Sequence, residues 1–358
     1  MFELFPLRAN RVMFLVLVAL ILSFLVARML TPMALRIGLS DRPGGRKQHE
    51  GTIPLTGGIG MFAGFAMAAL ASGLVVGATL ALVVALGLLV VGGAADDMHD
   101  ITARTKLFIQ LTAALFMTSW AGVYVSQLGN LFGFGPVNLY YWAIPFSVVC
   151  ALGVMNAVNM IDGLDGAAGG TSLVAALWLT YAAVAQGLGT EALLLVFLCA
   201  SICGFLLWNM RVPPLRDQAR IFMGDAGSMM LGLALCWFSI SVTQGEGRTL
   251  PPIVCVWILA VPLIDMARVM FLRLRRRADM FDADREHLHY LLLQRGMPAH
   301  TAALVMIGAA ALTGGLALWA WQLGVPEMVL TYAFLVVLGA IFWLGYLRER
   351  KERAARQP

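Results

Sequence analysis

The chain has 358 residues, of which 60% are hydrophobic and only 13% are charged, and its mean hydropathy is +0.82. Soluble globular domains carry about 25% charged residues, so the composition excludes an ordinary soluble protein. The net charge of +5 reflects how basic residues are distributed across a membrane, and we do not expect a nucleic-acid partner.

Apolar segments long enough to cross a bilayer recur along the whole chain. A crossing takes roughly 20 helical residues. We predict an all-α, polytopic integral membrane protein with eleven transmembrane helices, forming one domain over residues 1–358. The predicted spans are 12–31, 55–76, 78–95, 105–126, 139–159, 169–187, 190–209, 227–244, 251–272, 301–322 and 326–347.

The positions of Lys and Arg predict the orientation. When the loop 32–54 is placed in the cytoplasm, 22 of these residues lie inside and only Arg8, Arg11 and Arg248 lie outside. The N-terminus is then periplasmic and the C-terminus cytoplasmic, in a bacterial inner membrane. The loops predicted to carry the active site on the cytoplasmic face are 32–54, 96–104, 160–168, 210–226 and 273–300.

In this topology all twelve aspartates fall on the cytoplasmic side. A charged side chain costs about 2.5–3.5 kcal/mol at the centre of a membrane helix, so such clusters are placed for a reason. The first cluster is Asp96, Asp97 and Asp100, which converge if the third span continues as a helix. It is suited to attract a divalent cation or to accept a proton, and helix capping is the alternative.

A second cluster repeats every three residues at the end of the fifth span. It comprises Asn156, Asn159, Asp162 and Asp165, which form a polar stripe along one side of a helix. Carboxylate and amide oxygens suit Mg²⁺, which also keeps waters and substrate phosphates as ligands. The alternative is a polar seam that packs helices together.

Two further clusters complete the set. Asp225 lies between two glycines in the segment FMGDAGS, just before the eighth span, where a helix N-terminus favours anions; an N-cap is the alternative. Arg285, His287 and His289 can donate hydrogen bonds to phosphate oxygens. The two histidines are two residues apart, so they act together only where the backbone is irregular.

Acidic groups for a metal and basic groups for phosphates at one membrane surface indicate phosphoryl transfer. The segment DDMHD (96–100) also fits an isoprenoid transferase, which would need a second metal-binding motif. A transporter of anionic lipids is a third reading. It predicts ionisable residues near the midplane, but Asp265 is the only acidic residue well inside a span.

Six blocks of sequence resemble, in order, the polyprenyl-phosphate N-acetylhexosamine-1-phosphate transferases (glycosyltransferase family 4). The resemblance extends over nearly the whole chain. The blocks are DRPGGRKQHEGTIPLTGG (41–58), DDMHD (96–100), NAVNMIDGLDG (156–166), FMGDAGS (222–228), VPLIDMARV (261–269) and DREHLH (284–289).

The resemblance implies transfer of a sugar 1-phosphate from a UDP-sugar to undecaprenyl phosphate, with UMP as second product and Mg²⁺ or Mn²⁺ as cofactor. Expected partners are these two substrates, membrane lipid and a second copy in a homodimer. By family analogy, Asp96, Asp97 and Asp165 are catalytic, and Asp225 with Asn159 binds the metal. The implied substrate-binding residues are Lys47, Asn156, Asp162, Arg285, His287 and His289.

Two points remain open within the resemblance. Direct attack by the lipid phosphate competes with a covalent route through Asp165 or Asp162, and we favour direct attack. The opening motif is similar to the branch that uses UDP-GlcNAc, with another UDP-hexosamine or UDP-MurNAc-pentapeptide as alternatives. The usual His-x-His-His reads His287-Leu288-His289-Tyr290 here, so one expected diphosphate contact lacks its histidine.

Overall fold

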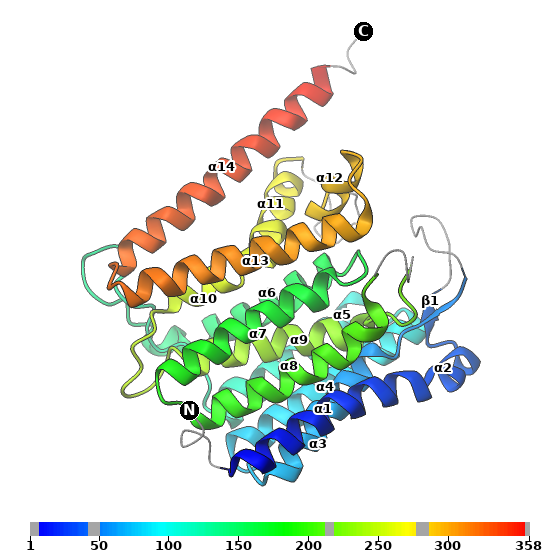
Figure 1. The fold of residues 1–358 in the computed structure, drawn as a ribbon. Coiled ribbons are helices and arrows are strands. Elements are labelled where there is room, and N and C mark those ends of the chain that lie inside the picture. The colour runs from blue at the N-terminus through cyan, green and yellow to red at the C-terminus, as the bar shows by residue number, and fades with distance from the viewer. Residues whose placement is uncertain (1–6, 42–50, 212–217, 277–285, 355–358) are drawn as a thin grey trace.

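The computed structural model describes residues 7–41, 51–211, 218–276 and 286–354, and regular structure in these ranges is almost entirely helical (Figure 1). Two short strands, β1 (Ser40–Asp41) and β2 (Ile53–Pro54), pair antiparallel. The helices are α1 (Ala9–Met29), α2 (Thr31–Ile37), α3 (Gly57–Ser72), α4 (Ala78–His99), α5 (Ala103–Leu115), a π-helical turn (Phe116–Trp120), a 3₁₀ turn (Tyr140–Trp142), α6 (Ala143–Ile161), α7 (Ala167–Ala185), α8 (Gly189–Asn209), α9 (Gly224–Ser241), α10 (Pro252–Ile258), α11 (Ala260–Arg276), α12 (Leu288–Gln294), α13 (Ala299–Gln322) and α14 (Glu327–Ala354).

Each of the eleven predicted spans contains a helix, which confirms an all-α, polytopic membrane protein. Within the described ranges, seven helices are long and apolar enough to cross a bilayer, and the bent pair α10–α11 is an eighth if it forms one broken span. The helices in the other three predicted spans, α3, α5 and α9, are shorter or more polar. Eleven crossings therefore stays a prediction.

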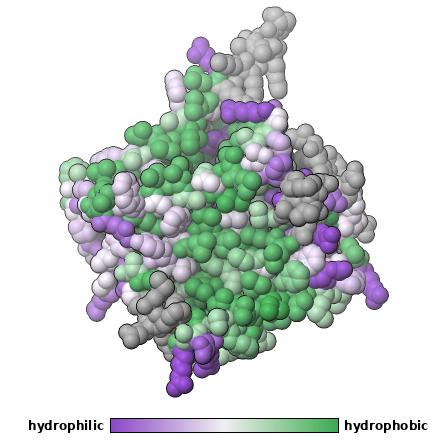
Figure 2. Space-filling model, in the orientation of Figure 1, coloured by the Kyte–Doolittle hydropathy of each residue, from purple (hydrophilic) through white to green (hydrophobic). Residues whose placement is uncertain are grey.

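The burial of α1 is the reverse of that in a soluble protein. Its large side chains face outward, with Phe14 63% and Ile21 49% exposed, while the small residues Ala19 and Ser23 are fully buried. Without a hydrophobic force between helices in lipid, small residues let backbones pack closely and large apolar ones face the hydrocarbon. A broad apolar surface of this kind crosses the visible face, with hydrophilic residues towards its margins (Figure 2).

Glycines set the distance between α1 and its neighbours α3 and α8. A Cβ at Gly64 would overlap the carbonyl oxygen of Ala19, and a Cβ at Gly204 would overlap that of Leu20. The contact also contains a hydrogen bond that the Ser23 hydroxyl donates to the Ser201 carbonyl at 2.7 Å. Close backbone approach therefore replaces side-chain burial in this part of the bundle.

The same device brings the polar end of α4 to the start of α9. A Cβ at Gly93 would overlap the backbone at Ala226, and one at Gly58 of α3 would overlap the backbone at Gly227. The segments DDMHD and FMGDAGS, remote in sequence, therefore meet at one end of the bundle. The start of α1 and the end of α14 lie at opposite ends of the molecule (Figure 1).

The predicted span 251–272 is broken rather than straight. The axes of α10 and α11 meet at 80° near Leu259. Pro262 lies in the first turn of α11, where its missing N–H is tolerated, so the helix restarts rather than continues. This proline is the sequence signal for the break. Beyond the bend, α11 contacts the start of α12 through Asp265 and the later part of α14 through Arg276 (Figure 1).

We expect Gly64→Leu to lower the free energy of unfolding by about 1–3 kcal/mol or to prevent assembly, because overpacking forces α1 and α3 apart. Gly308→Leu in α13 is the matched control, since a Cβ there meets no atom within 4 Å. Thermal unfolding of both variants in detergent measures the difference. Equal unfolding temperatures would contradict the packing assigned to Gly64.

Candidate active site

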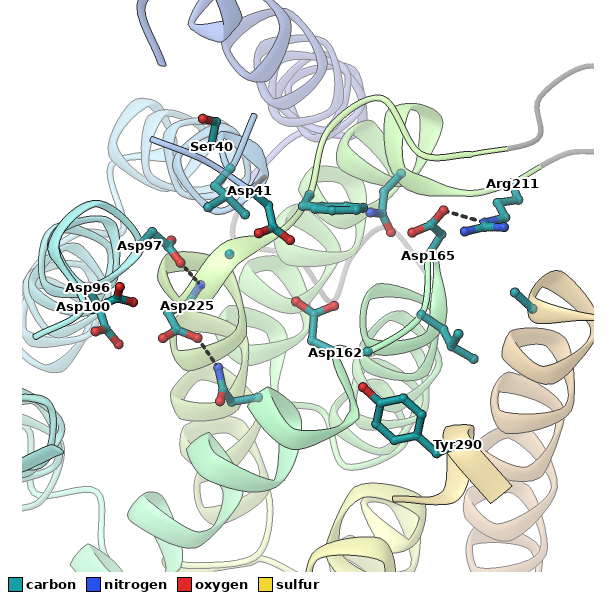
Figure 3. A pocket seen from close by; sticks show the side chains of 18 of the residues that line it. Ser40, Asp41, Asp96, Asp97, Asp100, Asp162, Asp165, Arg211, Asp225 and Tyr290 are labelled. Carbon is teal, nitrogen blue, oxygen red and sulfur yellow. Dashed lines mark hydrogen bonds and ion pairs between the residues drawn. The ribbon is translucent and has the colours of Figure 1, made fainter. Parts of the chain in front are cut away.

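A cavity of about 1190 Å³ opens where the polar clusters meet (Figure 3). Its lining draws on residues in or beside all five loops that the sequence predicts for the active site. The polar side chains along it include Ser40, Asp41, Asp96, Asp97, Asp100, Asn159, Asp162, Asp165, Asn209, Arg211, Asp225, Tyr290 and Gln294. Seven of these thirteen are carboxylates, so the cavity is suited to a cation together with a phosphate-bearing substrate.

Lys106 bridges the carboxylates of Asp96 and Asp225. Its ammonium contacts the Asp96 carboxylate at 3.0 Å and forms an ion pair with Asp225. Lys106 is not among the site residues predicted from the sequence. The available signal was its place in the first turns of α5, directly after DDMHD. The Lys106 ammonium lies between the carboxylates of Asp96 and Asp225. A metal cation at the same position would be neutralised by these two carboxylates.

Asp97 is held by the start of α9. Its carboxylate accepts hydrogen bonds from the backbone N–H of Asp225 at 2.9 Å and of Ala226 at 3.4 Å. Unpaired N–H groups at a helix N-terminus favour a carboxylate in this position. The catalytic role predicted for Asp97 stays a prediction, and the geometry adds that Asp97 positions the segment that carries Asp225.

The end of α4 turns its acids towards the cavity. Asp100 ends the helix in the left-handed conformation (φ 47°), and Asp96 accepts a hydrogen bond from the N–H of Ile101 at 3.0 Å. Asp96, Asp97 and Asp100 all line the cavity, as their helical spacing predicted. Asp41, which opens the DRPGG block, lines it too and was not among the predicted site residues.

The second cluster divides between the cavity and the helix interior. The Asn159 amide donates hydrogen bonds to Asp225 and, at 2.8 Å, to the Ser228 hydroxyl, which ties α6 to α9. Asn156 lies one turn deeper and donates to the side-chain oxygen of Gln110 at 3.2 Å. Asn156 is not part of the cavity lining, and its predicted substrate contact stays untested.

Asp162 and Asp165 follow the end of α6 at Ile161. Burial, and then the charges of Asp225, Asp97 and Asp165, raise the pKa of Asp162 to about 8. Without a cation, this carboxyl is therefore mostly protonated at pH 7.

Asp165 has partners of its own. It receives hydrogen bonds from Arg211 Nε at 2.5 Å and from the N–H of Ala219 at 2.9 Å. Arg211 joins Lys106 as a site residue that was not predicted from the sequence. Both basic residues could have been suspected only as balancing charges for the predicted acids.

The two predicted histidines, His287 and His289, lie in different surroundings. His287 is the N-cap of α12 and 8% exposed, and its ring lies parallel to that of His289 at 5.9 Å. His289 is 2% exposed and packs on Gly163, where a Cβ would overlap its ring. Burial lowers the pKa of His289 to about 4, so the ring is neutral near pH 7. The irregular backbone that the spacing required is therefore the start of α12.

Tyr290, rather than His289, reaches the cavity wall. This is the residue that stands where the family's usual motif has another histidine. A phosphate contact by His289 stays a prediction. The substrate-binding residues Lys47 and Arg285, predicted from the family resemblance, fall outside the described residues.

The donor set fits a hard divalent cation. Asp225 and the neighbouring Asp96 supply carboxylate oxygens, and Lys106 already places a positive charge between these two carboxylates. The Asn159 amide turns its NH₂ group to Asp225 here and would have to turn its oxygen there to share a metal. Within the ranges that the structure describes, no three His, Cys, Asp or Glu side chains form a complete metal cage. Mg²⁺ does not require one, because it keeps waters and takes one or two carboxylates plus substrate phosphates.

Comparison with known proteins identifies the family. Residues 79–243 match the glycosyl transferase family 4. Relatives named undecaprenyl-phosphate alpha-N-acetylglucosaminyl 1-phosphate transferase occur in Yersinia pestis and in Escherichia coli K12, each 34% identical over 90% of this chain and 87% of the relative. The Haemophilus influenzae relative of the same name is 30% identical over 93% of this chain and 96% of its own length. The chain therefore belongs to glycosyl transferase family 4, the family that its sequence motifs resemble.

Proposed function

We propose that this protein transfers N-acetylglucosamine 1-phosphate from UDP-GlcNAc to undecaprenyl phosphate, giving undecaprenyl-diphospho-GlcNAc and UMP. The step would start a cell-surface polysaccharide on its lipid carrier. The observation that carries the proposal is the acidic cavity at one end of an apolar bundle, where a lipid phosphate and a water-soluble nucleotide sugar can meet. Relatives that match nearly the whole chain are named for this reaction.

In the proposed reaction, an oxygen of the lipid phosphate attacks the sugar-bearing phosphorus of UDP-GlcNAc. The bond from that phosphorus to the bridging oxygen breaks, and UMP leaves with the electron pair. Asp96 accepts the remaining proton of the lipid phosphate or orients its oxygen, and Asp97 holds the Asp225 segment in place. Lys106 then balances the charge on Asp96 and Asp225. Such chemistry depends mainly on positioning and on charge neutralisation.

Asp225 and Asn159 are the residues that would hold the metal. Bound there, Mg²⁺ or Mn²⁺ would neutralise the diphosphate oxygens and make UMP a better leaving group. The partners of Asp165 support direct attack over a covalent intermediate. Its carboxylate is engaged by Arg211 and the Ala219 amide, which suits a positioning role better than that of a nucleophile.

The distribution of charge supports a cytoplasmic active site in a bacterial inner membrane. The cavity lies at the end of the bundle where basic residues gather, including Lys106, Arg211 and Arg268, whereas Arg248 lies at the other end. Basic residues concentrate on the cytoplasmic side of membrane proteins. A homodimer is part of the proposal from family analogy alone.

The reaction is tested by UMP release from purified protein with Mg²⁺. We expect UMP only when undecaprenyl phosphate and UDP-GlcNAc are both present, with UDP-GalNAc and UDP-MurNAc-pentapeptide run in parallel as alternative donors. A faster rate with either alternative would reassign the donor and leave the reaction class intact. If folded protein releases no UMP with any of the three donors, the proposed function is refuted.

Asp225→Asn should lower turnover by more than about 100-fold, since even outer-shell residues of metal sites cost about 10–100-fold. The amide keeps the shape but loses the charge that faces Lys106. Glu191→Gln, which removes a charge paired with Arg248 at the far end of the bundle, is the control and should keep its activity. Near-normal turnover of the Asp225→Asn variant would remove Asp225 from the metal site.

The raised pKa of Asp162 predicts a pH-dependent stability. Unfolded Asp162 has its ordinary pKa of 3.8 and folded Asp162 one of about 8, so between these values the folded state binds the extra proton. This contribution is complete below about pH 4 and is lost as the pH rises towards 8. In metal-free buffer, the unfolding temperature should fall more steeply from pH 6 to 9 in wild type than in Asp162→Asn.

Added Mg²⁺ should reduce that slope, because a cation in the cavity replaces the proton. If the unfolding temperatures of wild type and Asp162→Asn change with pH in parallel, the raised pKa is not that of Asp162.

A further inference from the structure

We infer that Asp265 is a positioning residue for the reaction, which it serves by orienting the imidazole of His287 and anchoring the start of α12. The inference rests on the proposed transferase function. Asp265 lies on α11 just beyond the 80° bend and is 3% exposed. It belongs to the block VPLIDMARV, which has no role in the reaction proposed above.

A carboxylate so deeply buried must be neutralised by its neighbours. One oxygen of Asp265 lies 2.8 Å from His287 Nδ1. The other accepts a hydrogen bond from the backbone N–H of Leu288 at 2.7 Å, and Arg268 Nη2 lies 3.4 Å from it. Asp265 therefore holds both the ring of His287 and the first residue of α12.

Arg268 extends the same anchor. It lies one turn further along α11, is 7% exposed, and donates a hydrogen bond to the backbone carbonyl of Glu286. Three consecutive residues, 286 to 288, are thus attached to one face of α11. The position of residues 286–288 beside the site is therefore set by α11.

The contact between Asp265 and His287 is connected to the cavity through packed aromatic rings. With Nδ1 committed to Asp265, Nε2 is the nitrogen of His287 that remains for another partner. His287 itself is not part of the cavity lining, so its orientation acts on the cavity through its neighbours. The His287 ring stacks on His289 with only 4° between their planes, and His289 in turn covers Gly163. Tyr290, the next residue, lines the cavity. A change at Asp265 is therefore transmitted to one wall of the cavity.

Asp265→Asn separates this role from simple helix anchoring. The amide oxygen can still accept the N–H of Leu288, so the start of α12 keeps its hydrogen bond. The amide NH₂ would then face His287 Nδ1 and force that nitrogen to become an acceptor. The imidazole would hold its hydrogen on Nε2 instead, as happens when an orienting aspartate is replaced by asparagine in hydrolase triads.

The first test is a double-mutant cycle on UMP release with Asp265→Asn, His287→Gln and the double variant. We expect Asp265→Asn to lower kcat by about 10–100-fold, the cost of losing a carboxylate that orients a functional histidine. The double variant should be no slower than His287→Gln within about 2-fold, because Asp265 acts through that ring. Losses that multiply would overturn the inference, since a purely structural role acts independently of His287.

The second test does not depend on activity, and its wild-type arm does not depend on the folding of any variant. The chain has five histidines, so selective ¹⁵N labelling in detergent allows each ring to be assigned. Wild-type His287 should show a hydrogen-bonded proton on Nδ1, and Asp265→Asn should lose it. The absence of an Nδ1 proton in the wild-type protein would overturn the inference.

Glu191→Gln is the matched control and should keep both the wild-type rate and the wild-type His287 signal. If wild-type protein releases no UMP with any donor, the proposed function fails while the ring signal still tests the Asp265–His287 pair. If wild type is active but the cycle is additive, the inference alone fails.

Discussion

A carboxylate at the edge of a hydrocarbon layer must be hydrated, paired or protonated, because leaving it charged and alone costs several kcal/mol. Four acids of the candidate site meet this constraint in three ways. Asp96 and Asp225 share the Lys106 ammonium, and Asp97 receives two backbone N–H groups of α9. Asp162 has a pKa raised to about 8 and, without a cation, is mostly protonated at pH 7. These pairings connect the end of α4 and the start of α5 to the start of α9.

The pairings depend on backbones that approach closely. Gly58 and Gly93 bring α3 and α4 against the start of α9, where any side chain would collide with Ala226 or Gly227. In lipid such contacts are the main source of helix association, since apolar side chains gain little by leaving the hydrocarbon. The glycines that make the bundle compact therefore also place Asp97 within reach of the Asp225 backbone.

The site has two layers with different tasks. Asp96, Asp162 and Asp225 border the cavity and are placed to meet substrate or metal. Behind them Asn156 joins α6 to α5 through Gln110, and Asp265 joins α11 to the histidine segment. The second layer rigidifies the first, which matters in phosphoryl transfer because catalysis there consists largely of positioning.

The sequence predicted the helices, the common side of the acidic clusters and the family motifs. These follow from local properties, namely the length of apolar runs and the spacing of polar residues, which each segment carries by itself. A helix occurs in every predicted span, and the cavity collects residues from every predicted loop. The break between α10 and α11 was missed, although Pro262 signals it.

Only the tertiary structure decided which groups are partners. The pairing of Lys106 with Asp225, the engagement of Asp165 by Arg211, and the burial of His289 against Gly163 each join segments remote in sequence. No local pattern encodes them, because they depend on which helix ends the glycine contacts bring together. The acids of the site could be predicted from charge and spacing along the chain. Their partners are determined by the packing of the helices.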